Sequence, residues 1–350
     1  MHRAALFIVV ILAASSIGGA VGYYSRGNEA TKAPLSIITA SLYTQLLESA
    51  SKDSGIKAVV QGMGAVQAAR QLMLVNGSYD LFVSVDPFII SSILEPRYAS
   101  WYIAIASDSM TIGYSSFAPD AKQIEQLARN ISLYDAIKDY SQALVYTEKV
   151  LNIIFSSEGK IGISNPNTDP EGYRALMLLQ LAGLLFYNNQ SYYTSLLQRY
   201  NETGNVVELN AGSQLLSYLQ SGEIDYDIAL YLSSARQAGV DYITLPPQLS
   251  LGDANFSSLY SMASVTIHSG GTAITIKGAP IFLSVTVPSG AKDQDLAAEF
   301  ILFLISQQGR ALMTNLGILP LTPALLYGNV TNVPPPLLYV ENTSILQVEG

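Results

Sequence analysis

The sequence predicts an α/β protein with two lobes. Three segments, at 34–40, 56–61 and 80–85, read as buried strands, and a helical pattern follows each of them. Strands that alternate with helices form a parallel sheet with short connections. The chain has 350 residues, 49% of them hydrophobic, and this length exceeds what one hydrophobic core usually organises. Two lobes are therefore the default expectation.

The three strand–helix units place small or acidic residues where each strand ends. Ser41 opens the first helical pattern, Gly62 and Gly64 precede the second, and Asp86 and Pro87 precede the third. In parallel α/β sheets, ligands bind outside the carboxyl ends of the strands. We therefore expect three helix N-termini to converge on one binding site.

The rest of the chain continues this alternation. Further strands are expected at 110–114, 161–164, 206–209, 226–232, 242–245 and 280–287, and helices at 213–220 and 295–316. The segment 269–279 reads as a returning loop or a hairpin. The last segment, 332–350, contains a run of prolines and reads as an extended surface tail or a disordered one.

A helix start at Asp169 is the most informative local feature. Asp169 supplies an N-cap acceptor, Pro170 occupies the first helical position, and Glu171 places an acid in the first turn. A helix N-terminus attracts anions, yet a carboxylate already stands at this one. That combination restricts the ligands that could bind here.

The N-terminal segment predicts export. Residues 1–24 carry Arg3, an apolar run at 4–14 and then small residues, which is the layout of a secretory signal peptide. The run 4–24 is also long enough for an uncleaved membrane anchor, which needs ~20 apolar residues. The chain has no cysteine, so a lipidated thiol and disulfides are excluded. We expect an extracellular or cell-surface protein whose membrane contact, if the segment is retained, runs through this helix.

Possible glycosylation sites also suit an extracellular protein. N-x-S/T sequons suit a glycosylated surface, although a chain rich in Ser, Thr and Asn also produces several by chance. They begin at Asn76, Asn130, Asn189, Asn201, Asn255, Asn329 and Asn342. A net charge of −9 with scattered basic residues argues against nucleic acid or anionic lipid as a partner.

Catalysis has little support in the sequence. His2 lies in the N-terminal segment, and His268, the other histidine, reads as a loop residue. Gly62 and Gly64 are too weak a signal for a nucleotide site, and no GK[ST] phosphate loop is present. We expect a protein that is not an enzyme and that has no cofactor.

The run around Asp169 carries a family resemblance. NPNTDPEGYRALM, at 165–177, resembles the NPNDDPxGYRxLM signature of archaeal-type tungstate/molybdate-binding proteins, the extracytoplasmic receptors of ABC oxyanion importers. Other matches follow in the family's order across 34–336: ITASL (38–42), GAVQAAR (64–70), DLFVSVD (80–86), YASWYIAIASDSMTIGYS (98–115), SGEIDY (221–226), YITLP (242–246) and APIFLSVTVPSGA (279–291).

The resemblance implies a type II periplasmic-binding-protein fold. In that fold two α/β lobes are joined by two crossover segments, and the ligand lies in the cleft between the lobes. Lobe 1 is expected at 34–111 plus 272–332, lobe 2 at 112–271, and an extended C-terminal tail at 333–350. Binding is expected to close the lobes by hinge motion at the crossovers.

The resemblance also implies oxyanion contacts in the first lobe. Ser41 stands where the family has its first oxyanion-binding serine, although from the residue alone it reads as an ordinary N-cap. Ser84 and the Val85 amide stand at the matching place after the third strand. Ala65 departs from the family, where a serine is common, so only its backbone N–H remains as a donor. A lost hydrogen bond to a charged group costs ~1.5–3 kcal/mol.

In the second lobe the resemblance implies contacts from Asp169 and Tyr231. Asp169 is the candidate carboxylate ligand to the tungsten or molybdenum of the bound oxyanion, although an N-cap role alone would also explain it. Leu230 stands where relatives have a second acid, a glutamate. Asp227, three residues earlier on the strand, is expected to face the opposite side unless a bulge turns it. The anion is then expected to remain tetrahedral or to become five-coordinate through Asp169.

These features predict an extracytoplasmic, monomeric receptor that captures tungstate or molybdate and delivers it to an ABC permease and its ATPase. A carboxylate that faces a dianion is repelled unless it bonds to the central atom, which tungsten and molybdenum permit and sulfur does not. The alternatives are a receptor for another tetrahedral oxyanion, such as sulfate or phosphate, and, less favoured, a secreted hydrolase or a surface adhesin.

Overall fold

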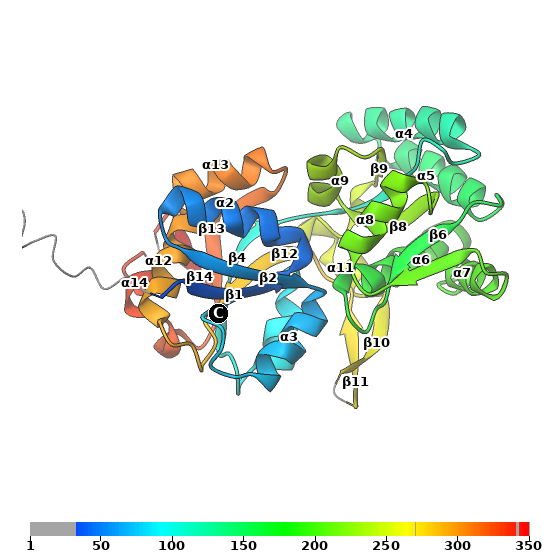
Figure 1. The fold of residues 1–350 in the computed structure, drawn as a ribbon. Coiled ribbons are helices and arrows are strands. Elements are labelled where there is room, and N and C mark those ends of the chain that lie inside the picture. Colours follow the sequence, from blue (N-terminus) through cyan, green and yellow to red (C-terminus); the bar gives the residue numbers. More distant parts are fainter. Residues whose placement is uncertain (1–32, 270, 341–342, 350) are drawn as a thin grey trace, which may run out of the picture. The chain divides into compact units, whose positions relative to one another are not determined.

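Two β-sheets, one of seven strands and one of five, organise the chain, and a hairpin of two strands forms a third pairing (Figure 1). The computed structural model describes residues 33–269, 271–340 and 343–349. A compact unit begins at Leu35, and the segment before it lies almost wholly outside the described residues. The expected signal peptide or anchor at 1–24, with His2, therefore lies outside them too.

The seven-stranded sheet contains the three strands that the sequence predicts first. Its order is β14-β13-β4-β12-β3-β1-β2. The strands are β1 (Leu35–Ala40), β2 (Ala58–Met63), β3 (Leu81–Ser84), β4 (Trp101–Ser107), β12 (Phe282–Thr286), β13 (Leu319–Gly328) and β14 (Leu346–Val348). β1 pairs in parallel with β2 and β3, as predicted. β12 inserts antiparallel between β3 and β4, so a late segment of the chain completes the sheet.

Helices lie on both faces of this sheet, which explains why β1 and β3 read as continuous apolar runs. The helices are η1 (Ser41–Tyr43), α2 (Thr44–Ser54), α3 (Ala65–Leu74), η2 (Ile89–Leu94), α12 (Gln294–Ile305), α13 (Gln307–Asn315), η4 (Val330–Asn332) and α14 (Pro335–Leu338). α2 packs with α12 and α13, and α3 lies on the opposite side of the sheet (Figure 1).

The single helix predicted at 295–316 is wrong, because Ser306 divides it. Ser306 adopts an extended conformation between α12 and α13, and its hydroxyl accepts a hydrogen bond from Gly309 N at 3.2 Å. A serine that caps a new helix start offers the backbone an alternative to a continuous helix. The apolar period continues across the break, so the pattern alone could not reveal it.

The five-stranded sheet has the order β7-β6-β8-β5-β9. Its strands are β5 (Met110–Tyr114), β6 (Ile161–Ser164), β7 (Val206–Leu209), β8 (Tyr226–Tyr231) and β9 (Tyr242–Thr244). The helices of this part are α4 (Ala121–Ala136), α5 (Tyr140–Ile154), α6 (Pro170–Tyr187), α7 (Tyr192–Glu202), α8 (Gly212–Ser221), α9 (Leu232–Ala238), α10 (Pro247–Ser250), η3 (Ala254–Phe256) and α11 (Ser257–Tyr260). β6 runs parallel to β7 and β8, and β5 runs antiparallel to β8 and β9.

α6 is the most buried of these helices, and Gly172 positions its start. Most side chains from Pro170 to Gly183 are buried. A Cβ atom on Gly172 would lie 2.0 Å from the carbonyl oxygen of Ser164, so only glycine lets the first turn of α6 approach the end of β6. The glycine of the GYR motif therefore has a packing role.

Two segments connect the sheets. The first joins β4 to β5 through Asp108 and Ser109, and Asp108 also bonds to Ser233, on the first turn of α9, through both the backbone N–H and the hydroxyl. The second follows the hairpin of β10 (Ser264–Ser269) and β11 (Thr272–Lys277) and leads into β12. The segment 269–279, expected as a returning loop or a hairpin, contains the turn and the second strand of this hairpin, whose first strand begins earlier, at Ser264. His268 lies on β10 and not in a loop, which corrects that expectation.

The C-terminal segment is only partly the extended surface tail that we expected. Leu346–Val348 forms β14, which pairs in parallel with β13 at the edge of the seven-stranded sheet. Leu346, on β14, and Leu337, on α14, are both buried, and α14 packs on α12. No helix within the described ranges combines the length and apolar character needed to cross a bilayer.

Candidate functional site

A small cavity lies between η1, which follows a strand of the seven-stranded sheet, and the starts of α6, α8 and α9, which follow strands of the five-stranded sheet. Its volume is about 40 Å³, and its lining comes from Ser41, Leu42, Asp169, Glu171, Gly212, Ser213, Leu216 and Ser234. The Ser41 hydroxyl donates to the Ser213 hydroxyl at 3.0 Å across the cavity wall. A single water needs roughly 10–15 Å³, so this space suits a small inorganic ion and is too small for a sugar or a peptide.

The side chain of Asp169 caps the N-termini of two helices at this cavity. Its Oδ1 accepts from Glu171 N in the first turn of α6, and its Oδ2 accepts from Gly212 N at the first residue of α8, both at 3.0 Å. Burial raises the pKa of Asp169, while the two backbone hydrogen bonds and Arg174 oppose the rise. The positive ends of both helices favour the ionised carboxylate.

Two more carboxyl groups are buried close to Asp169. Glu171 is 3% exposed and Asp227 is 1% exposed. Burial, followed by the charges of Asp227 and Asp169, raises the pKa of Glu171 well above its usual range. Burial raises the pKa of Asp227 to about 7. Within the described ranges, no group of three or more His, Cys, Asp or Glu side chains is arranged to hold a metal ion.

Sequence reasoning placed Asp227 on the wrong side of β8. Thr111 of β5 pairs with Leu230 of β8, and Gly113 of β5 pairs with Asp227 of β8. Between these two pairs β8 advances by three residues and β5 by two, so β8 contains one extra residue, as in a β-bulge. A Cβ atom on Gly113 would lie 2.9 Å from Leu230 Cδ2 and 3.5 Å from Asp227 Cβ. The irregularity therefore brings Asp227 and Leu230 to the same side of the strand.

Leu230 itself packs in an apolar cluster and Asp227 is held locally. The cluster contains Leu215, Leu219 and Ile224 besides Leu230. Asp227 Oδ1 accepts from Ala229 N at 3.3 Å. Asp227 is not among the described residues that line the cavity.

A second cluster beside the cavity centres on Arg174. Its guanidinium donates to Tyr231 Oη at 2.6 Å and to the carbonyl of Val85 at 3.2 and 3.3 Å, and it pairs with Asp86 Oδ2 at 3.0 Å. Tyr173 Oη also donates to Asp86, at 2.5 Å. Arg174 thus links α6 and β8 to the end of β3.

Arg174 and Tyr43 are residues that sequence reasoning missed. Arg174 belongs to the GYR motif, but the sequence did not indicate that its side chain is buried or which residues it contacts. Tyr43 is fully buried, and its hydroxyl has no partner among the described residues. Tyr231 Oη accepts from Arg174, and no described residue accepts the proton of this hydroxyl, which can therefore be donated to a ligand. These two hydroxyl groups are additional donors near the predicted site.

Ser84 and Ala65 stand apart from the cavity lining. The Ser84 hydroxyl accepts from Asp86 N at 3.2 Å and donates to Asp86 O at 3.0 Å, so a local turn uses it. Ala65 is the first residue of α3 and is buried. The residue before it, Gly64, approaches Thr168 so closely that a Cβ atom would lie 2.4 Å from the Thr168 carbonyl oxygen. The start of α3 therefore packs on the turn that leads to Asp169.

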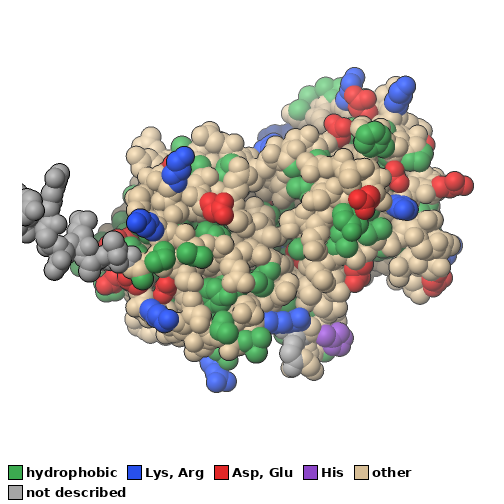
Figure 2. Space-filling view, in the orientation of Figure 1, with side chains coloured by type: hydrophobic (Ala, Val, Ile, Leu, Met, Phe, Trp, Pro, Cys, Tyr) green, Lys and Arg blue, Asp and Glu red, His purple; other side chains and the backbone are tan. Residues whose placement is uncertain are grey.

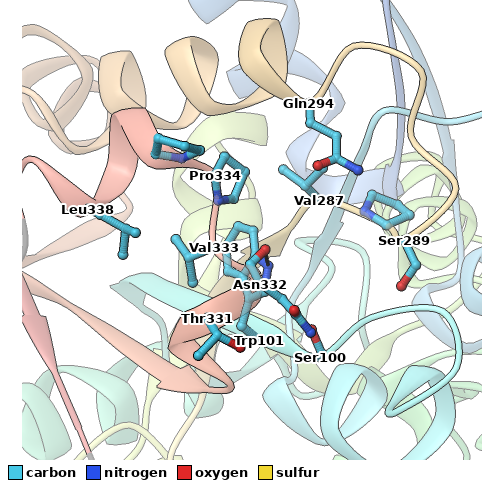
Figure 3. Close-up of a pocket in the computed structure, with 12 residues that line it drawn as sticks. Ser100, Trp101, Val287, Ser289, Gln294, Thr331, Asn332, Val333, Pro334 and Leu338 are labelled. Atoms are coloured by element: carbon cyan, nitrogen blue, oxygen red, sulfur yellow. Dashed lines mark hydrogen bonds between the residues drawn. The ribbon is translucent and has the colours of Figure 1, made fainter.

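A larger cavity of about 570 Å³ lies elsewhere (Figure 3). It is lined from the start of β4, the end of β12 and the C-terminal segment, and Trp101 Nε1 donates to Asn332 O at 3.1 Å beside it. Its described lining contains no charged side chain and none of the predicted site residues.

On the face of the molecule that Figure 2 shows, basic side chains are scattered singly among acidic ones.

Sequence comparison assigns the family. The sequence profile of the bacterial extracellular solute-binding proteins matches residues 37–318. The chain belongs to this family. An uncharacterized solute-binding protein of Saccharolobus solfataricus is 31% identical over 77% of this chain and 65% of its own length. The molybdate/tungstate-binding protein of Pyrococcus abyssi is 27% identical over 94% of this chain and 95% of its own length.

Solved structures place this solute-binding protein in the type II periplasmic-binding-protein fold, as the sequence predicts. The periplasmic molybdate-binding protein of Azotobacter vinelandii matches with a TM-score of 0.54 at 18% identity, over 81% of this chain and 98% of that one. The sulfate-binding protein SubI of Mycobacterium tuberculosis matches with a TM-score of 0.53 at 11% identity, over 90% and 94%. The family is one of solute-binding proteins and not of enzymes.

Proposed function

We propose that this solute-binding protein captures tungstate or molybdate outside the cell and delivers it to an ABC permease and its ATPase. The observation that carries the proposal is the Asp169 carboxylate at an ion-sized cavity, held between the N-termini of α6 and α8. The relative from Pyrococcus abyssi, which this chain matches over nearly its whole length, is named as a molybdate/tungstate-binding protein.

Dipoles, and not net charge, attract the anion in this proposal. The described cavity lining includes two acids and no Lys or Arg, and the nearby Arg174 is committed to Asp86, Val85 and Tyr231. The helix N-termini and the hydroxyls of Ser41 and Ser213 supply the donors. The Ala65 and Val85 amides, Ser84 and Tyr231 are proposed as further contacts, reached when the two lobes move relative to each other.

Asp169 would select the anion by its charge. A carboxylate beside a dianion is repelled unless the central atom accepts its oxygen. Tungsten and molybdenum expand their coordination in this way, whereas sulfur and phosphorus in their tetrahedral oxyanions do not. A sulfate or phosphate receptor remains the second candidate, because Leu230 is apolar at the position where the family resemblance implies a second acid.

Calorimetric titration of the mature protein with tungstate, molybdate, sulfate and phosphate tests the proposal. We expect tungstate and molybdate to bind at least about a hundredfold more tightly than sulfate and phosphate, equivalent to ~2.7 kcal/mol. Equal or tighter sulfate or phosphate binding would favour the second candidate. Turnover of ester or glycoside substrates would favour a hydrolase.

A further inference from the structure

Glu171 is a buried acid, and one of its two carboxyl oxygens has no hydrogen-bond partner among the described residues. Its Oε1 atom is fully buried and unpartnered among the described residues. Buried polar atoms in proteins are nearly always hydrogen-bonded, and an unpartnered buried carboxyl is costly. The guanidinium of Arg174, on the same helix, pairs with Asp86 and not with Glu171.

The carboxyl group of Glu171 belongs to the same cavity as Asp169. Both residues line it. The backbone of Gly212 lies against the Glu171 carboxyl, since a Cβ atom at Gly212 would lie 2.1 Å from Oε2. The start of α8 thus holds the Asp169 oxygen by its N–H and leaves room for the Glu171 oxygens beside it.

Asp227 is another acid that is buried close to Asp169 and Glu171. Its Oδ2 is also buried without a partner, but Asp227 does not line the cavity and its Oδ1 is held by Ala229 N. Leu230, at the position where an acid was expected, is apolar. Glu171 is therefore the acid that reaches the ligand space together with Asp169.

We propose that Glu171 donates a carboxylate oxygen to the central atom of the bound tungstate or molybdate, beside Asp169. This inference rests on the proposed function. For Glu171 one bond forms, from a carboxylate lone pair to tungsten or molybdenum, and the carboxyl O–H bond breaks as its proton passes to water; no metal–oxygen bond breaks and no electron is transferred. The coordination number of the metal rises by one for Glu171 and by one for Asp169, which gives six. Glu171 then takes the role that Leu230 does not fill.

X-ray absorption at the tungsten edge, combined with titration calorimetry, tests the role of Glu171. The natural protein with tungstate should give a six-coordinate signal, and Glu171→Gln, which keeps the size of the side chain, should give a five-coordinate one. Tungstate affinity of Glu171→Gln should fall at least about tenfold, while sulfate affinity should stay equal or rise. A four-coordinate signal in the natural protein overturns the inference.

Two further variants make the result specific. Glu125→Gln removes the same charge from the exposed face of α4 and should change neither the coordination number nor the affinity. Gly212→Ala changes no charge but displaces the Glu171 carboxyl, and it should weaken tungstate binding. If Asp227→Asn lowers the coordination number and Glu171→Gln does not, Asp227 is the second ligand and the inference is wrong.

Folding and the proposed function are separable in these measurements. Thermal unfolding without ligand should show that Glu171→Gln is at least as stable as the natural protein, because it removes an acid buried near two others. If the natural protein binds neither tungstate nor molybdate, the proposed function fails. If it binds tungstate and Glu171→Gln binds it equally with the same coordination, only the role of Glu171 fails.

Discussion

The carboxylate of Asp169 accepts a hydrogen bond from the backbone N–H of Gly212 at 3.0 Å, so the N-cap of α6 also closes the start of α8. A capping residue ordinarily serves one helix. Here one side chain ties together two helices on neighbouring strands of the five-stranded sheet, at the wall of the cavity.

Replacing Asp169 should therefore affect stability and binding together. Asp169→Ala removes two caps, each worth ~1 kcal/mol, so we expect a loss of about 2 kcal/mol and no measurable tungstate binding. Asp169→Asn keeps one acceptor oxygen and should be more stable than Asp169→Ala, yet it should bind tungstate as poorly. Thermal unfolding and calorimetry measure both quantities. Tight tungstate binding by a folded Asp169→Asn variant would remove Asp169 from the ligand set.

Ser41 and Ser84 were predicted as equivalent contacts, and the structure now separates them. Ser41→Ala should weaken tungstate binding by about tenfold or more, because a hydrogen bond to a charged group is worth ~1.5–3 kcal/mol. Ser84→Ala should weaken it less, since the Ser84 hydroxyl is engaged with Asp86. Calorimetry on both variants decides the order, and a larger effect at Ser84 would mean that the turn rearranges around the ligand.

Arg174 should matter more for stability than any surface ion pair. Arg174→Met leaves the buried Asp86 carboxylate with Tyr173 but without its cation. Breaking a buried pair costs ~3–5 kcal/mol. The control is Arg129→Met, which breaks the exposed pair with Glu125 and should cost less than about 1 kcal/mol. Urea unfolding measures both, and similar losses in the two variants would contradict the prediction.

The buried carboxyl group of Asp108, at the connection between the sheets, should make the free energy of unfolding depend on pH. Burial raises its pKa from 3.8 to about 6, against the opposing hydrogen bonds from Ser233 and Ser109. The folded state then binds more protons than the unfolded state between about pH 4 and pH 6, so stability falls as pH rises through this window, by up to about 3 kcal/mol. Thermal unfolding across pH 4–8 should show this fall in the ligand-free protein and a smaller one in Asp108→Asn. An unchanged slope in the variant would assign the fall to other carboxyls.

Ligand binding should also compact the protein. The cavity takes its walls from helices that follow strands of both sheets, and Ser41 and Ser213 meet across it. An anion can enter only if these walls separate, by hinge motion at the two connecting segments. Small-angle scattering of the mature protein should give a smaller radius of gyration with saturating tungstate than without it. Identical curves would indicate a molecule that is already closed.

Local patterns were sufficient for most of the individual elements. The apolar runs at 34–40 and 80–85 became β1 and β3, and the Asp-Pro-Glu sequence from Asp169 marked the start of α6. These signals work because strand burial, N-capping and the proline position depend on residues within one or two turns. The same reasoning failed at Ser306, where a cap interrupts a continuing apolar period. It also failed at β14, because a strand of 3 residues is too short to show a period.

The sequence by itself determined the fold class, the family, and the residues at the helix start beside the cavity. Only the tertiary structure decided how these residues combine. Hydrogen bonds join residues that are far apart in the sequence. Asp169 and Gly212 are separated by 43 positions, Val85 and Arg174 by 89, and Ser41 and Ser213 by 172. The side of β8 that carries Asp227 depended on a register shift against β5, and the unpartnered state of Glu171 depended on which donors packed near it. Such contacts arise from the packing of distant segments, and no local pattern of spacing or polarity encodes them.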